Sequence, residues 1–169
     1  MTSDSMPTGA FSCEVTMELS QWPKFVREEK GGVTYLVARG YELGYKTTLR
    51  FASGAELPVR ATLLGELNQQ IVIRDARGRP VQTSGYVQGL LEIADAAGRV
   101  IFRGRYYDSR VVQPLSGDDA LTATGQRVSD HWENGFGEGP YAGHAFSMGV
   151  RLTRAGSAPM AGQGRGQID

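Results

Sequence analysis

Hydrophobic and polar residues alternate with a period of two in several short segments of the chain. In residues 11–19, apolar side chains at every second position are separated by Glu14, Thr16 and Glu18, which gives a β-strand one buried and one wet face. Similar segments recur with glycine-containing turns between them, a pattern typical of all-β sandwiches and barrels. We expect strands at 11–19, 33–39, 43–51, 57–64, 69–74, 81–94, 100–112, 121–132 and 144–154.

Two further features refine this fold class. The long segment 81–94 contains Gly85 and Gly89, and glycines inside a long strand mark the bends or bulges that barrels require. The alternation is interrupted at 20–29, where Ser20 can cap a short helix and Pro23 fits its first turn. The sequence therefore predicts an all-β fold, an antiparallel β-barrel of about eight or more strands with one short helix.

A short motif, D-A-x-G-R, occurs at 75–79 and again at 95–99. Aspartate opens such a turn by accepting hydrogen bonds from the backbone that follows, and glycine supplies a positive φ. Both copies are therefore predicted to be hairpin turns that join three strands of a meander. A calcium loop is excluded, because each turn offers one carboxylate and calcium takes about six or more oxygen ligands.

The length and composition favour one domain. A chain of 169 residues can bury one core and is short for two. We expect a flexible N-terminus at 1–10, a single barrel domain at 11–154, and a disordered C-terminal tail at 155–169, where the sequence is small, polar and rich in glycine.

Charge and cysteine content narrow the partners and the location. Lys and Arg total 18 and Asp and Glu total 18, so no positive excess exists to attract nucleic acid or an anionic membrane, and we expect neither partner. Residues 1–10 lack the features of a secretion signal, which favours a cytoplasmic protein. Cys13 is the only cysteine, so it forms no intrachain disulfide, and its apolar face predicts a buried, unreactive thiol.

The segment GFGEGPYAGH at 135–144 resembles the G-x-G-x-Y-x-G signature that precedes a late strand in allene oxide cyclase and dirigent-like barrels. It differs by one extra residue, Pro140, before Tyr141. The resemblance implies an eight-stranded antiparallel barrel with an apolar lumen, often oligomeric, and in some members the cyclisation of a flexible, reactive ligand. The same residues also suit an ordinary hairpin turn, and no catalytic residue can be carried over from a match confined to this turn.

The alternation along two predicted strands, 100–112 and 144–154, indicates which polar side chains face the interior and are therefore candidates for catalysis. The more apolar face of 100–112 carries Phe102, Tyr106 and Asp108, so Asp108 is expected inside, where a carboxylate needs a partner such as Arg110, His131 or a tyrosine. It can be an ion-pair tie at the rim or a general acid or base.

His144 raises a similar choice. It shares a face with Phe146 and Met148, and it can be a satisfied core residue, a turn residue or a pocket acid or base. Two histidines without a nearby ligand do not make a metal site, and no cofactor signature is present, so we expect neither a metal nor a cofactor. The catalytic candidates are Asp108, His144 and Tyr106, and the ligand-binding candidates are Trp132, Phe146, Met148, Phe102 and Tyr141.

These expectations leave three functions open. The first is a cyclase or isomerase that folds an apolar, polyketide-like or unsaturated substrate in the barrel lumen, where orientation lowers the barrier. The second is a non-catalytic module that binds an apolar small molecule. The third is an accessory protein that only forms oligomers, with a filled lumen and an apolar outer patch.

Overall fold

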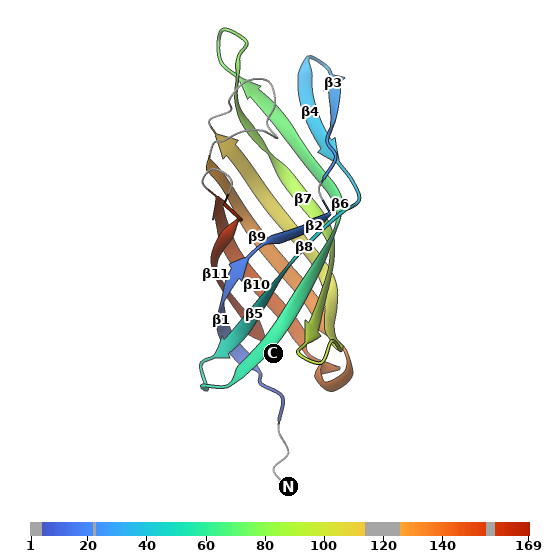
Figure 1. Ribbon diagram of the computed structural model, residues 1–169, viewed down its shortest axis with the longest axis vertical. Coiled ribbons are helices and arrows are strands. Elements are labelled where there is room, and N and C mark those ends of the chain that lie inside the picture. Colours follow the sequence, from blue (N-terminus) through green and yellow to red (C-terminus); the bar gives the residue numbers. More distant parts are fainter. Residues whose placement is uncertain (1–4, 22, 114–125, 155–157) are drawn as a thin grey trace.

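Eleven antiparallel strands form one continuous sheet in the computed structural model, which describes residues 5–21, 23–113, 126–154 and 158–169 (Figure 1). The strands are β1 (Gly9–Thr16), β2 (Glu18–Gln21), β3 (Val26–Lys30), β4 (Val33–Ala38), β5 (Tyr41–Phe51), β6 (Glu56–Arg74), β7 (Pro80–Asp95), β8 (Val100–Gln113), β9 (Gln126–Gly137), β10 (Ala145–Arg154) and β11 (Ala161–Ile168).

Eight of these strands close into a barrel, in the order β5-β1-β11-β10-β9-β8-β7-β6, and β6 pairs with β5 to complete the ring. Closure gives the backbone of both outermost strands a partner and so removes the exposed edges that an open sheet would present. The predicted antiparallel barrel is confirmed. The other strands extend it: β2 pairs with β5, while β4 pairs with the second half of β6 and carries β3 at one end of the barrel (Figure 1).

Several strands are longer than the sequence indicated. The segments predicted as separate strands at 57–64 and 69–74 are one strand, β6, with a register shift between Gly65 and Leu67. Strand β9 continues to Gly137, so part of the predicted glycine-rich turn belongs to a strand. The predicted start of this strand, at 121–125, lies outside the described residues.

The predicted helix at 20–29 is wrong. The described residues there form β2 and β3, and β3 makes a hairpin with β4 through Gly31 and Gly32, both at positive φ. A short helix is marginal by itself, whereas pairing with β5 and β4 supplies interstrand hydrogen bonds. The helix that the described residues do contain is one 3₁₀ turn, Gly139–Tyr141, and none of them forms a helix long and apolar enough to cross a membrane.

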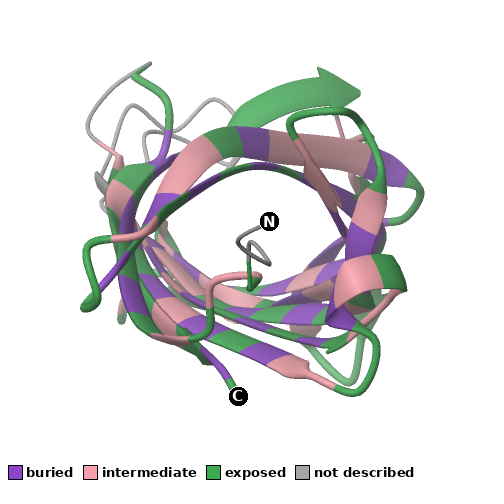
Figure 2. Cartoon of the chain, turned by 90° about the horizontal axis from the view of Figure 1, so that it is seen from below, coloured by how far each residue is buried: buried purple, intermediate pink, exposed green. Residues whose placement is uncertain are grey.

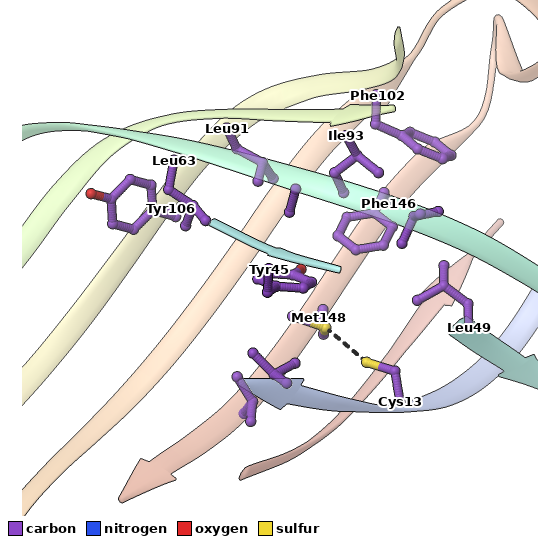
Figure 3. Close-up of a cluster of buried hydrophobic side chains, with 14 of the residues drawn as sticks. Cys13, Tyr45, Leu49, Leu63, Leu91, Ile93, Phe102, Tyr106, Phe146 and Met148 are labelled. Carbon is purple, nitrogen blue, oxygen red and sulfur yellow. Dashed lines mark hydrogen bonds between the residues drawn. The ribbon is translucent and has the colours of Figure 1, made fainter. Parts of the chain in front are cut away.

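The prediction of a disordered tail is also wrong, because β11 lies between β1 and β10 and closes the barrel. Three of its inward positions are the glycines Gly162, Gly164 and Gly166, and neighbouring side chains occupy the space next to Gly164 and Gly166. A Cβ atom at Gly164 would lie 2.9 Å from the sulfur of Cys13 and 3.0 Å from that of Met148. The two sulfur atoms are 3.5 Å apart inside the barrel (Figure 3). At the other terminus, β1 begins at Gly9, two residues before the predicted domain boundary.

Both D-A-x-G-R segments are hairpin turns, as predicted. Gly78 and Gly98 have φ values of 77° and 82°. The Asp75 carboxylate accepts hydrogen bonds from the backbone N–H groups of residues 77 and 79 at 2.9 and 3.0 Å, and Asp95 does the same at 97 and 99.

Buried and exposed residues alternate along the strands, so one side of the sheet faces the lumen (Figure 2). The end of the lumen nearest the 3₁₀ turn is packed with aromatic rings. Phe146 stacks on Phe11 with centroids 5.5 Å apart and contacts Phe102 at 5.3 Å, while Tyr141 contacts Phe102 at 4.9 Å. Side chains therefore fill this half of the barrel, as in other small barrels.

Candidate functional site

A row of buried ionisable side chains crosses the middle of the lumen. Asp108 on β8 lies directly opposite His131 on β9, and Glu133 follows two residues later on the same face of β9. All three are at most 3% exposed. Charged groups are rarely buried to this degree unless they are paired, so the contacts among them decide what the row can do.

The row is continuously hydrogen-bonded. His131 donates through Nδ1 to Asp108 and through Nε2 to Glu133 Oε1, the second at 2.9 Å. The Tyr45 hydroxyl on β5 donates to Glu133 Oε2 at 2.6 Å, and the Ser129 hydroxyl donates to Asp108 Oδ2 at 3.0 Å. Side chains from three strands therefore hold one imidazole in a fixed orientation.

The two carboxylates favour the charged form of the imidazole. An ionised carboxylate can only accept a hydrogen bond, so His131 satisfies both neighbours only when both ring nitrogens carry protons. Burial by itself would lower the pKa of His131, but the charge and hydrogen bond of Asp108, assisted by Glu133, raise it to about 10. Burial would raise the pKa of Asp108, yet His131 and Arg110 hold it below its usual range. We infer an imidazolium between two carboxylates at neutral pH.

Arg110 completes the charge balance. Its guanidinium lies 3.4 Å from Asp108 Oδ2 and is 16% exposed. Two positive groups, Arg110 and His131, thus face two negative groups, Asp108 and Glu133. The carboxylates lie on opposite sides of the imidazole and do not converge on one point, and the described residues contain no cluster suited to hold a metal ion.

Two phenol groups beside this row have no hydrogen-bond partner among the described residues. The hydroxyls of Tyr41 on β5 and Tyr106 on β8 are buried, and each affects the pKa of the other without forming a hydrogen bond of normal geometry. Burial raises the pKa of both, so both remain protonated at neutral pH. They are therefore buried donors that lie close to each other, with Asn68 also close to Tyr41, but that form no hydrogen bond of normal geometry, at the point where the lumen turns from apolar to polar.

The structure places most of the predicted site residues inside the barrel. Tyr106 and Asp108 belong to the polar row and its neighbours, and the ring of Tyr106 lies 5.7 Å from that of His131. The predicted interior position of Asp108 is confirmed, and of the partners considered for it the structure supplies both His131 and Arg110. The buried residues of the apolar half include Phe102, Phe146 and Met148 (Figure 3). Tyr141 belongs to the same buried cluster.

Trp132 lies outside the lumen, contrary to expectation. It is 44% exposed, because its neighbours in sequence, His131 and Glu133, occupy the inward positions of β9. Its ring stacks on that of Tyr107 at 5.9 Å, and Tyr107 stacks in turn on Tyr86 at 6.2 Å. These three side chains form an outer aromatic ladder across β7, β8 and β9.

His144 is also separate from the polar row. It is partly exposed next to the C-terminus, and its Nδ1 hydrogen-bonds to the backbone oxygen of Asp169. It precedes Val150, the residue opposite His131, by six positions. At about 3.3 Å per residue this places the two histidines about 20 Å apart, so they do not form one site.

Sequence reasoning missed Glu133, Tyr45 and Tyr41 as site residues and considered His131 only as a partner for Asp108. The inward face of β9 carries Ser129, His131 and Glu133, whereas the outward face is the more apolar one. The usual assumption that the more apolar face of a strand points inward is therefore wrong for β9. The sequence offers no local signal for this reversal, because the register of β9 against β8, which pairs Gly135 with Gly104, comes from the structure alone.

Hollows lie both on the outer wall and in the lumen. One of about 450 Å³ runs over β8, β9 and β10 beside Phe136, which is 78% exposed. In the lumen, a hollow of about 20 Å³ lies at the end nearest β3 and β4, next to Arg110.

The chain matches no protein-family model, no curated protein and no solved structure at a significant level. The likeness to allene oxide cyclase and dirigent-like barrels therefore depends on the glycine-rich segment and the strand layout alone. In that segment Tyr141 is fully buried and donates a hydrogen bond to the backbone oxygen of Pro7 at 2.8 Å. A role in anchoring the N-terminal segment accounts for this tyrosine without any catalytic function.

Proposed function

We propose that this chain is a cofactor-independent cyclase or isomerase that acts on an apolar, unsaturated carbonyl compound inside the barrel. The observation that supports the proposal is the pair of buried hydroxyls of Tyr41 and Tyr106, which form no hydrogen bond of normal geometry and lie next to a fixed array of charges. Unsatisfied polar groups cost stability when buried, and such groups cluster where a ligand completes their hydrogen bonds.

The two phenols are suited to polarise a carbonyl group. A hydrogen bond from Tyr41 or Tyr106 to a carbonyl oxygen draws electron density from the alkene conjugated to it, and a diene of the same molecule can then add across that alkene. Of the three π-electron pairs involved, two become new σ bonds and the third becomes a new double bond within the substrate, so no electron, proton or other reactant has to be supplied. The lumen hollow next to Arg110 measures about 20 Å³ and the apolar half is packed with aromatic rings, so these apolar side chains must move apart to admit the substrate, and they then hold its two ends together.

The charged row acts on these donors as a positioning device. Asp108 is fixed by His131 and Ser129 and lies two residues from Tyr106 on the same face of β8. A dense network of this kind holds side chains in one arrangement before the ligand arrives, which is the condition for strong electrostatic stabilisation of a transition state. His131, enclosed by two carboxylates, orients its neighbours and does not itself contact the substrate.

The proposal is tested with a synthetic polyenone in which a conjugated enone is tethered to a diene, followed by chromatography of the cyclised product. We expect the protein to accelerate cyclisation and to give one stereoisomer. Tyr106→Phe removes one donor and should lower the rate about tenfold or more. Tyr107→Phe, at the exposed neighbouring position, is the matched control and should leave the rate unchanged.

An equal rate in Tyr106→Phe and Tyr107→Phe would show that the phenol does not act on the carbonyl. Binding of the polyenone is measured separately, by quenching of protein fluorescence. If the polyenone binds but cyclises no faster than it does without the protein, catalysis of this reaction is excluded and the chain is a binding module.

That second candidate, a non-catalytic module for an apolar small molecule, is favoured by the outer wall. The hollow of about 450 Å³ beside Phe136 is open to solvent, with Gly104 and Gly135 at its floor. The neutral fluorophore N-phenyl-1-naphthylamine tests it: saturable binding that Phe136→Ser abolishes and Tyr106→Phe preserves would place the ligand outside the barrel.

A further inference from the structure

Besides the hollow beside Phe136, the outer wall has a hollow of about 220 Å³ over β10. The strand register places Trp132 on β9, Gly149 on β10 and Arg165 on β11 next to one another in one row. Neighbouring strands are about 4.8 Å apart, so the backbones that carry Trp132 and Arg165 are about 10 Å apart. Gly149 has no side chain to fill that interval, and the indole and the guanidinium therefore flank an open space.

The indole of Trp132 is held at the edge of this space. On the side away from β10, its ring stacks on that of Tyr107 at 5.9 Å. A Cβ atom at Gly149 would lie 3.5 Å from Cδ1 and 3.7 Å from Nε1 of Trp132, so the edge with the N–H group is turned toward β10. Because Trp132 is also 44% exposed, it offers a ligand both an apolar ring and a hydrogen-bond donor.

Arg165 gives the hollow a positive charge that no acidic group neutralises. Within the described part of the chain, its exposed side chain forms no ion pair or hydrogen bond. Arg151 and Asp130, which also line the hollow, pair with each other through two hydrogen bonds at 2.8 and 3.2 Å, so their charges cancel. The imidazole of His131 faces the lumen. The net positive charge of the hollow therefore favours an anionic ligand.

The two hollows of the outer wall follow each other along β10. Ser147 pairs with Asn134 on one side and with Gln167 on the other, and all three line the hollow beside Phe136. We call the two hollows together the outer groove. It follows residues 145–151 of β10, a span of about 20 Å, with aromatic side chains on the β9 side and amide and guanidinium groups on the β11 side.

A chain of sugar rings combines the surfaces that this groove offers. Each ring has an apolar face of C–H groups, which packs on an aromatic side chain, and a rim of hydroxyls, which bonds to amide and guanidinium groups. An extended peptide suits the groove less, because β9, β10 and β11 are each paired on both sides and offer no free edge to which a strand can add. The unpaired Arg165 adds a preference for a carboxylate.

We propose that the outer groove binds an acidic saccharide, a chain of sugar units that carry carboxylates, with one unit over Gly149. The carboxylate of that unit pairs with Arg165, and its ring lies against Trp132. This site is outside the lumen, so the inference goes beyond the proposed function and does not rest on it.

The test is isothermal titration calorimetry of the full chain with trigalacturonic acid and with its trimethyl ester, which lacks the negative charges. We expect the acid to bind at least about fivefold more tightly than the ester, since an exposed ion pair contributes modestly. Arg165→Gln should remove this difference. Arg60→Gln changes an exposed arginine of β6, three strands away in the barrel, and should retain it.

Gly149→Val fills the hollow without straining the fold. Gly149 is not at positive φ, its added Cβ atom would be at ordinary van der Waals distance from Trp132, and valine suits a strand. This substitution should weaken binding of the acid about tenfold or more, because the sugar ring and the valine compete for one space. Thr153→Val, at an exposed position of the same strand, is the matched control and should leave binding unchanged.

The site would be overturned by a lack of measurable binding of trigalacturonic acid, by equal binding of acid and ester to the unaltered chain, or by unchanged binding in Gly149→Val. Triaspartate presents its carboxylates on a peptide backbone, and binding as tight as that of the saccharide would overturn the choice of a sugar. Saccharide binding with the expected dependence on Gly149 and Arg165, in a chain that fails to cyclise the polyenone, would support this site and contradict the proposed cyclase.

Discussion

Removing the buried imidazole should destabilise the barrel strongly, and more at neutral than at alkaline pH. His131→Leu leaves Asp108 and Glu133 in the lumen without the positive group between them. Breaking a buried charge pair in this way costs about 3–5 kcal/mol. The pKa of His131 gives a similar figure: it rises from 6.5 to about 10 on folding, and at about 1.4 kcal/mol per tenfold change in proton affinity this corresponds to about 5 kcal/mol.

The pH dependence has a definite sign. A group with a higher pKa in the folded than in the unfolded state contributes stability that is complete below its unfolded pKa and is lost as the pH rises through its folded pKa. For His131 that window runs from 6.5 to about 10. The free energy of unfolding of the unaltered chain should therefore fall by about 3 kcal/mol between pH 7 and pH 9 through this group, and His131→Leu should lack that slope.

Urea denaturation followed by tryptophan fluorescence and circular dichroism measures both quantities. Asp130→Asn is the matched control, because Asp130 is the adjacent residue of β9, is partly exposed and pairs with Arg151 at 2.8 Å. Its loss should cost less than about 1 kcal/mol. The charged row would be refuted if His131→Leu lowered the free energy of unfolding by less than about 1 kcal/mol. It would also be refuted if the free energy of unfolding had the same pH dependence in His131→Leu as in the unaltered chain.

Three further substitutions or treatments test the fold. Gly98→Val forces a β-branched residue to a φ of 82° and should lower the free energy of unfolding by about 1 kcal/mol or more, measured by urea denaturation. Gly65→Ala places a methyl group against the Tyr41 ring and should cost about 1–3 kcal/mol, and Tyr41→Leu should rescue part of this cost in a double-mutant cycle. Burial, with the charge of Glu133, raises the pKa of Cys13 to about 12, so iodoacetamide at pH 8 should alkylate it only in denaturant.

The barrel was predictable from the sequence because most of its strands alternate in the ordinary way. Strands β1 and β7 and the first half of β8 carry mostly apolar residues on the inward face, and the turns at Gly78 and Gly98 carry a motif with one physical interpretation. These local signals agree with the global fold, and a strand can be predicted from its own sequence when the two agree.

The candidate site was less predictable because its strand breaks that rule. Strand β9 turns Ser129, His131 and Glu133 inward and Trp132 outward, so the polar face is the buried one. Only the partners on β5 and β8 make this arrangement stable, and their proximity is a product of barrel closure.

Strand β11 was hidden for a related reason. Its glycines look like the composition of a disordered segment, yet they accommodate the side chains of Phe11, Cys13 and Met148 from its two neighbours. The glycines of β11 make room for large side chains of the adjacent strands, and these side chains occupy the space next to them. Small barrels commonly fill their interior in this way.

The protonation state of His131 is the most direct test of the account, because the charged row depends on it and the proposed function depends on the charged row. Nitrogen NMR of the chain with ¹⁵N-labelled imidazoles, assigned by comparison with His131→Leu, reports each ring nitrogen separately. We expect both nitrogens of His131 to carry protons at pH 7, with titration only near the pKa of about 10, and Asp108→Asn should lower that pKa. A neutral His131 ring at pH 7 in the unaltered chain would contradict the account.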